Sequence, residues 1–323
     1  MKREPLLTFR YQYSPISQGF FVLSTLARAP YTRAAYRAAW SREQPFRTEE
    51  RVALASAQRI LKKHHSTLAG IYYGSARSHA TEIVRRDFSA ADVRAITRAF
   101  HAIRPRLESF RTTWEAAAAR VPSQLEDAYR SRARGALMRD ISIWCRIPLR
   151  AYTCETLVLL APETPNHTSG GGANGSAGQI ELEVPAHPDH HAALDALRVA
   201  HHEVIHALFA RPLRAAIDAT LEERVPERLT LPALEGYTWP QLLEELAVSL
   251  VFPMGVFAQR YLDAPPLPRG GGAVRSFSDV ERAVLGRRAA TARTRVAQGT
   301  GCDTSLVHAL ITDVLALAHG HSL

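Results

Sequence analysis

The chain has 323 residues, 46% of them hydrophobic, so it can bury a full core in one large domain or two smaller ones. Its 40 lysines and arginines exceed its 31 acidic residues, which gives a formal net charge of +9. No run approaches the roughly 18 apolar residues of a membrane-spanning helix, and the first residues contain no apolar stretch typical of a secretion signal. We therefore expect a soluble, cytoplasmic protein with no membrane partner.

The positive charge comes almost entirely from arginine and is scattered along the chain. This favours a solvated surface while leaving a nucleic-acid partner open. The three cysteines, Cys145, Cys154 and Cys302, are widely spaced and form no Cys-x-x-Cys pair. They are interpreted as ordinary thiols rather than as a disulfide framework or a cysteine zinc site.

From about residue 31 to residue 150 the chain is rich in Ala, Arg, Leu and Glu at helical spacing. This pattern predicts a mainly helical N-terminal region over residues 1–150. Ser89 and Asp92 form an acidic version of a capping box, which predicts a helix start. Pro105 and Pro122 are expected to break helices or to begin them.

A different composition follows, and it predicts two strands. The apolar run 157–161 fits a buried strand, and in 180–184 apolar residues alternate with Glu181 and Glu183, as in a half-exposed strand. The segment 169–178 between them is interpreted as a flexible glycine-rich loop. It lacks the spacing of a phosphate-binding loop, so nucleotide binding is rejected there.

The segment 189–210 then predicts a helix, with Asp189 as its N-cap and Pro212 just past its end. It contains the pattern His-Glu-x-x-His at His202, Glu203 and His206. Two histidines four residues apart lie on one face of a helix, where both imidazoles can bind a single tetrahedral Zn²⁺ ion. Glu203 is then close enough to take a proton from an attacking water. The motif thus supplies two ligands and a base, in a setting where unpartnered polar groups would be costly to bury.

A catalytic zinc site needs a third protein ligand. The metzincin pattern is excluded, because Phe209 and Pro212 stand where its glycine and its third histidine would be. The apolar segment 238–253 contains Glu244 and Glu245, and a charge in such a stretch indicates a partner. Other glutamates are weaker alternatives: Glu222, Glu223, Glu227 and Glu235.

A helix carrying His-Glu-x-x-His, followed by a glutamate on a later helix, resembles the gluzincin branch of the zincin metallopeptidases. Many gluzincins carry the distal ligand in a run of the form E-G-x-A or E-x-x-A. Aligning "EELA" to this run implies that Glu244 is the ligand. Glu245 stands where glycine is common, so Glu245 remains an alternative ligand. If Glu244 is the ligand, Glu245 orients a histidine or pairs with an arginine. The resemblance covers roughly residues 150–255 and implies an α+β, predominantly helical fold, with a zincin-like domain over 151–323 and a small sheet beside the motif helix.

The resemblance also implies a zinc-dependent peptidase that acts on peptide or protein substrates. The strand at 179–184 could hold an extended peptide by backbone hydrogen bonds. An oxyanion in such a site usually has a second stabilising group. Tyr237, Tyr261 and His308 are the candidates, and for each of them an ordinary packed or surface position is the commoner explanation.

The C-terminal part returns to helix over 278–298 and 305–320, with Ser278 and Glu281 as a predicted capping box. A second function class remains open, a non-catalytic zincin-like module whose basic surface binds a partner such as nucleic acid. Glu203 favours the peptidase, because a structural metal site needs ligands but no base beside them.

Overall fold

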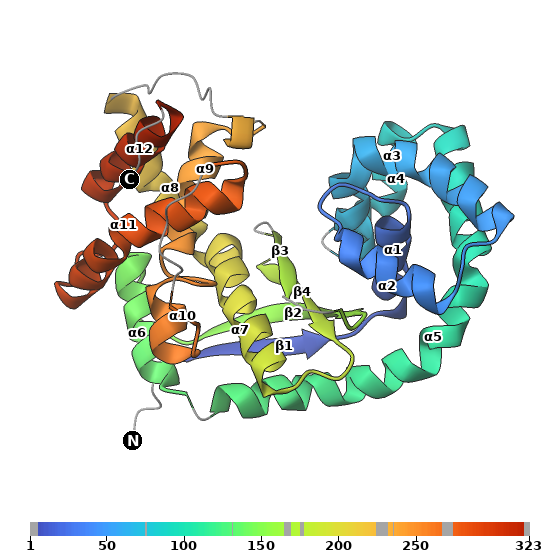
Figure 1. Cartoon of the computed structure of the whole chain (residues 1–323), viewed down its shortest axis with the longest axis horizontal. Helices are drawn as coiled ribbons and strands as arrows, with labels where there is room; N and C mark the ends of the chain where they lie inside the picture. The colour runs from blue at the N-terminus through green and yellow to red at the C-terminus, as the bar shows by residue number, and fades with distance from the viewer. Residues whose placement is uncertain are drawn as a thin grey trace. The chain divides into compact units, whose positions relative to one another are not determined.

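The computed structural model describes residues 6–74, 76–130, 132–164, 169–174, 178–223, 232–234, 236–266 and 274–319. The α-helices are α1 (Pro15–Leu26), α2 (Ala34–Glu43), α3 (Thr48–Tyr72), α4 (Ala80–Asp87), α5 (Ala90–Arg130), α6 (Arg134–Trp144), α7 (His190–Val204), α8 (Ala210–Glu223), α9 (Trp239–Ser249), α10 (Val256–Tyr261), α11 (Phe277–Ala297) and α12 (Thr304–Ala318). The strands are β1 (Leu7–Gln12), β2 (Tyr152–Ala161), β3 (Gly170–Asn174) and β4 (Gln179–Pro185). Short helical turns lie at Arg77–His79, Ile205–Phe209 and Pro232–Leu234. The predicted class, predominantly helical α+β, is confirmed (Figure 1).

The chain divides into two compact units, each built from separate segments of the sequence. The first unit comprises Met1–Phe9, Ala128–Cys154 and Leu197–Leu323, and the second comprises Arg10–Asp127 and Glu155–Ala196. The boundary predicted near residue 150 follows a change in composition along the chain. The compact units instead join segments that are distant in the sequence.

The strands form one mixed sheet in the order β1-β2-β4-β3 (Figure 1). β2 and β4 are parallel, with Glu155 opposite Gln179, and β3 runs antiparallel to β4. The two predicted strands therefore exist, but the glycine-rich segment predicted as a loop contributes a strand of its own. Small side chains at 170–173 allow the backbone to pair closely, which the composition alone did not indicate.

The position of β4 inside the sheet corrects one functional expectation. β2 and β3 occupy both of its hydrogen-bonding edges, so the strand at 179–184 cannot hold an extended peptide by adding it to the sheet. The outer strands are β1 and β3.

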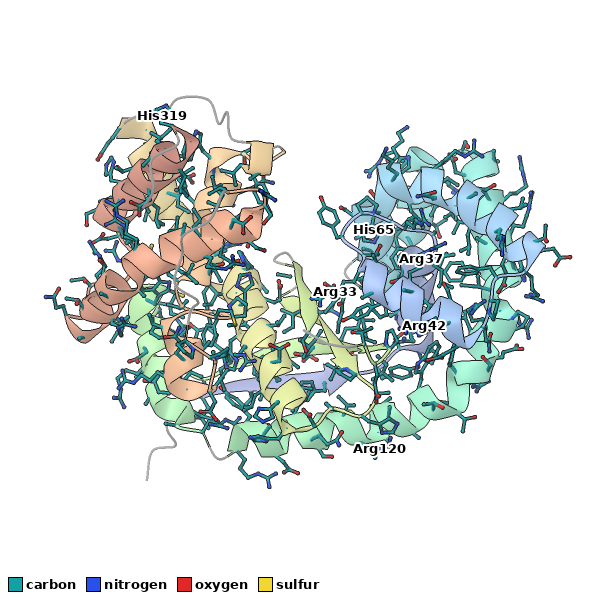
Figure 2. The ribbon with its side chains drawn as sticks, in the orientation of Figure 1. Arg33, Arg37, Arg42, His65, Arg120 and His319 are labelled. Carbon is teal, nitrogen blue, oxygen red and sulfur yellow. The ribbon has the colours of Figure 1, made fainter. Side chains whose placement is uncertain are left out.

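A side chain from the residue before α2 and one from α7 fix the start of β3. Arg33 donates a hydrogen bond to the Ser169 carbonyl at 2.7 Å, and its guanidinium lies 3.3 Å from Glu183 of β4 (Figure 2). Asp195 of α7 accepts a hydrogen bond from the Ser169 backbone N–H at 2.5 Å. Polar contacts at this end compensate for the absence of side-chain packing from the glycines of the strand.

The long helix α5 contains both prolines that were expected to break it. Its start is the predicted capping box, in which Ser89 Oγ accepts from the Asp92 N–H at 3.1 Å and Asp92 accepts from the Ser89 N–H at 3.0 Å. A proline inside a helix costs about 3 kcal/mol, but burial of an apolar stripe can offset that cost. Fully buried side chains lie on both sides of the prolines: Ile103, Ala117, Val121 and Leu125.

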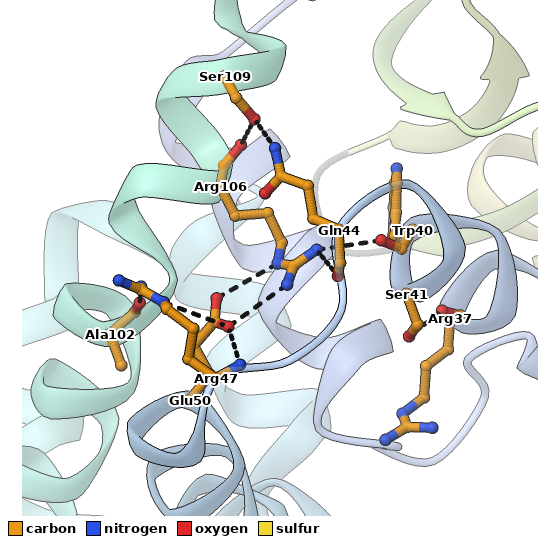
Figure 3. Close-up of polar contacts among 9 residues, drawn as sticks. All are labelled: Arg37, Trp40, Ser41, Gln44, Arg47, Glu50, Ala102, Arg106 and Ser109. Atoms are coloured by element: carbon orange, nitrogen blue, oxygen red, sulfur yellow. Dashed lines mark hydrogen bonds and ion pairs between the residues drawn. The ribbon is translucent and has the colours of Figure 1, made fainter.

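A buried ion pair joins α5 to α3 (Figure 3). Arg106 and Glu50 are each only 2% exposed, and two guanidinium nitrogens of Arg106 lie 3.4 Å from the Glu50 carboxylate. Arg106 also donates to the carbonyls of Trp40 at 3.0 Å and Gln44 at 2.7 Å. Burial alone would raise the pKa of Glu50, but hydrogen bonds from the Arg47 backbone and from Arg106 outweigh it and lower the pKa. The pair is therefore ionised and fully partnered.

Glu50→Gln is expected to lower the free energy of unfolding by about 3–5 kcal/mol, because it leaves the buried Arg106 charge without its counter-ion. Glu108→Gln is the matched control, since Glu108 forms an exposed pair with Arg104 at 2.7 Å, where the expected loss is about 0.5 kcal/mol. Urea denaturation of the two variants measures the difference. Equal losses would show that the buried pair contributes no more than a surface pair.

The C-terminal helices pack within the first unit, where α8 contacts α9 and α12, and α11 contacts α6 and α9. The cap of α11 lies two residues before the predicted capping box. Ser276 Oγ accepts from the Asp279 N–H at 3.3 Å, so Ser276 and Asp279 form the cap in place of Ser278 and Glu281. Within the described ranges, no helix is both long and apolar enough to cross a bilayer.

Candidate metal centre

The motif lies on a helix that continues further than predicted. Asp189 caps its start as expected, because its carboxylate accepts a hydrogen bond from the Ala192 N–H at 2.7 Å. α7 then passes through a π-helical turn at Ile205–Phe209 into α8, so Pro212 lies inside the helix rather than past its end. The wider turn directly precedes the proline, where the missing N–H already interrupts the α-helical hydrogen bonds.

The two motif histidines direct their Nε2 atoms at each other, 3.2 Å apart. Nδ1 of His202 lies 3.0 Å from the Phe252 carbonyl, and Nδ1 of His206 lies 2.8 Å from Glu244 Oε1. Since a carbonyl and an ionised carboxylate only accept, both Nδ1 atoms donate. When both rings are neutral, the two Nε2 lone pairs face the same point, where either a proton or a metal cation can relieve their repulsion.

Glu245 supplies the third donor at this point. Its Oε2 lies 3.5 Å from Nε2 of His202 and 3.6 Å from Nε2 of His206. A tetrahedral zinc ion with bonds of about 2.0–2.2 Å separates its ligand atoms by about 3.3–3.6 Å. The three observed separations, 3.2, 3.5 and 3.6 Å, lie in this range or within about 0.1 Å of it. Two imidazoles with one carboxylate are a ligand set typical of zinc hydrolases. No other group of three such donors was found in the described part of the chain.

Of the two glutamates that remained candidate ligands, the structure brings Glu245 rather than Glu244 to the Nε2 atoms of the histidines. Glu244, predicted as the ligand, faces Nδ1 of His206 and also accepts hydrogen bonds from Nε and Nη2 of Arg214. Burial would raise the pKa of Glu244, but the contacts with His206 and Arg214 outweigh it and lower the pKa. Adjacent residues on a helix point about 100° apart, so only one of the two can face the Nε2 pair. That residue is Glu245.

The centre favours positive charge. Burial alone would lower the pKa of His206, but hydrogen bonds to Glu244 and Glu245 outweigh it and raise the pKa to about 10. Burial also opposes the charged form of His202, whose pKa is nevertheless raised by Glu245 and by the charge of Glu203. Carboxylates that stabilise imidazolium here would equally stabilise a divalent cation.

Glu203 has the properties of a proton acceptor. Burial raises its pKa, and the positive charges of His202 and His206 only partly oppose this shift. A carboxylate with a raised pKa binds a proton more readily, as a general base must during the reaction. Glu203 is also not needed as a third ligand, because Glu245 occupies that position.

His201 directly precedes His202, so it points about 100° away from it around the helix, and it is fully buried. Its Nδ1 donates to the Leu197 carbonyl at 2.7 Å, and its Nε2 lies 3.0 Å from the Tyr129 hydroxyl. Burial lowers its pKa to about 4. Its ring stacks on Phe252, with 5.1 Å between ring centroids, and Phe252 carries the carbonyl that orients His202. His201 therefore supports the site without being a ligand.

The three candidate oxyanion stabilisers make contacts of other kinds. The Tyr261 hydroxyl donates to Asp140 at 2.6 Å. His308 lies 3.3 Å from Glu223 of α8, and the exposed Tyr237 stacks on Phe277 with ring centroids 5.1 Å apart. None of these contacts involves the donor atoms of the centre, so the role predicted for these residues gains no support.

The four other glutamates that were weaker candidates for the third ligand are not found at the centre in the described part of the chain. Glu222 and Glu223 are exposed on α8, and Glu227 and Glu235 lie outside the described residues. Arg214 and the Phe252 carbonyl were not predicted from the sequence. Arg214 comes eight residues after His206, about two turns along, but the intervening π turn changes its direction and no sequence pattern marks such a turn.

Comparison with known proteins adds no further identification. No protein-family model, curated protein or solved structure matches the chain. The proposed function therefore depends on the motif and on the geometry of these side chains.

Proposed function

We propose that the protein is a zinc-dependent peptidase whose metal is held by His202, His206 and Glu245. The observation that carries the proposal is the convergence of two Nε2 atoms and one carboxylate oxygen at separations of 3.2–3.6 Å, with both Nδ1 atoms engaged elsewhere. A zinc ion in such a site lowers the pKa of water and polarises a carbonyl group.

The chain's own residues then perform the remaining tasks. Glu203 accepts a proton from the attacking water and passes it to the nitrogen of the leaving amine, which needs a carboxylate of raised pKa. Glu244 fixes the tautomer and the ring orientation of His206, and Arg214 holds Glu244 in its ionised form. The Phe252 carbonyl fixes the tautomer and the ring orientation of His202. Each of these groups keeps a reacting or ligating atom correctly directed.

The non-catalytic alternative shares the ligands but has no use for Glu203. A structural zinc site is closed by four protein ligands, whereas the convergence of donors here involves three from the described chain, as a catalytic site requires. The position of Glu203 directly after a ligand histidine in the motif favours catalysis further. The two functions differ in one measurable property, turnover of a peptide.

Removal of the metal tests the proposal. The purified protein is expected to hydrolyse a labelled unfolded protein such as casein, to lose this activity after treatment with a zinc chelator, and to regain it when zinc is restored. A non-chelating isomer of the same compound is the control and should have no effect. Zinc binding without hydrolysis of any peptide would support the non-catalytic alternative, and hydrolysis that survives complete metal removal would contradict the zinc mechanism.

A further inference from the structure

Arginines occur along the whole chain, but the largest net positive charge belongs to one region. Residues 10–127 contain 19 lysines and arginines and 10 acidic residues, a net charge of +9 that equals the net charge of the whole chain. Residues 155–196 contain six acidic residues and no lysine or arginine. The helical part of the second unit is therefore a polycation, a property that attracts polyanions.

One stretch of this region that contains no acidic residue includes most of α3. No aspartate or glutamate occurs between residues 51 and 81, and two of the three lysines of the chain, Lys62 and Lys63, lie there. Arg51, Arg59 and Lys62 are exposed and are spaced by eight and three residues, so they form a stripe along one face of the helix. None of the three forms an ion pair with a described residue. The stripe is about 16 Å long, because Arg51 and Lys62 are 11 residues apart and an α-helix rises by about 1.5 Å per residue.

An exposed aromatic side chain lies beside the end of this stripe. Tyr31, in the loop between α1 and α2, is 89% exposed and has a φ of 65°. Its ring centroid lies 6.2 Å from that of His65. His65, labelled in Figure 2, follows Lys62 by three residues on α3, just past a kink at the residue before it. The His65 ring in turn stacks on Phe20, with centroids 5.9 Å apart. His65 is therefore held in place by packing and supports the exposed ring of Tyr31.

We infer that α3 and Tyr31 form a binding surface for single-stranded nucleic acid. The stripe of Arg51, Arg59 and Lys62 contacts successive phosphates, and Tyr31 stacks on an unpaired base at the end of the stripe. A row of cations next to an exposed aromatic ring is the arrangement that binds single strands with little sequence preference. An acidic protein or an anionic membrane would use the cations but has no base to stack on Tyr31. This surface is independent of the proposed zinc site.

The test is fluorescence anisotropy of a labelled single-stranded oligothymidine with the full chain, over a range of salt concentrations. In Arg51→Gln/Arg59→Gln/Lys62→Gln, the slope of log affinity against log salt is expected to become shallower by about 2, because each lost phosphate contact on a single strand contributes about 0.7. Tyr31→Ala is expected to weaken binding about 5- to 150-fold, and Tyr31→Phe to retain it, because phenylalanine can still stack.

The matched control is Arg139→Gln/Arg146→Gln/Arg293→Gln, which removes three exposed arginines from the other unit. It should leave binding close to that of the unmodified chain. Equal losses in the two triple variants would overturn the inference, since they would reflect net charge alone. Equal affinity for a duplex of the same length, unaffected by Tyr31→Ala, would also overturn it. So would preferential binding to phosphatidylserine vesicles, which would identify the surface as a membrane contact.

Discussion

Glu203→Gln is expected to reduce peptide hydrolysis by about 10²–10⁴-fold while the protein keeps its zinc. Glutamine has nearly the same shape as glutamate but cannot accept a proton, so the change removes the base without emptying space in the helix. The ligands His202, His206 and Glu245 remain in place. Measuring kcat on a quenched-fluorescent peptide, together with zinc content, separates the loss of the base from the loss of the metal.

The control for this experiment is Glu222→Gln, which alters an exposed glutamate on α8 and should leave kcat unchanged. Retention of full activity by Glu203→Gln would contradict the assignment of Glu203 as the proton acceptor. Loss of zinc together with activity would instead mean that Glu203 holds the metal, which the position of Glu245 does not predict.

A second large effect is expected at the two neighbouring glutamates. Glu244→Gln should weaken zinc binding about 10- to 100-fold, the usual cost of losing a group that orients a ligand. Glu245→Gln should weaken it more than that, because one of the three ligand atoms is replaced by a neutral, poorer donor. Competition with a fluorescent zinc chelator gives both dissociation constants.

The variant that loses more zinc affinity identifies which of the two glutamates is the ligand. A larger loss in Glu244→Gln would restore the role that the resemblance to gluzincins implied for Glu244. An unchanged dissociation constant in Glu244→Gln would show that its contact with His206 Nδ1 does not stabilise the ligand geometry. Glu222→Gln again serves as the control, because it makes the same change of side chain at an exposed position on α8.

Local chemistry made part of the centre predictable from sequence. The four-residue spacing places His202 and His206 on one helical face whatever the tertiary structure, and the Asp189 cap needs only neighbouring backbone N–H groups. Two glutamates in an apolar helix indicated a buried polar partner. All of these signals depend on residues within a few positions of one another.

The choice between Glu244 and Glu245 depends on how α9 is rotated against α8, and sequence spacing does not determine that rotation. The π turn at Ile205–Phe209 sets the direction of Arg214, whose contact with Glu244 turns Glu245 toward the histidines. The continuation of α5 through its prolines and the glycine strand β3 were missed for a similar reason. Tertiary packing and strand pairing outweighed their local preferences.

The most direct test of the zinc centre is elemental analysis of the purified chain beside His202→Ala/His206→Ala. His190→Ala/His191→Ala, which changes two exposed histidines on the same helix, is the matched control. We expect about one zinc per chain in the unmodified protein and in the control, and none in His202→Ala/His206→Ala, with helix content by circular dichroism unchanged in all three. An absence of zinc from the unmodified chain after reconstitution, or equal zinc in all three, would rule out the zinc centre.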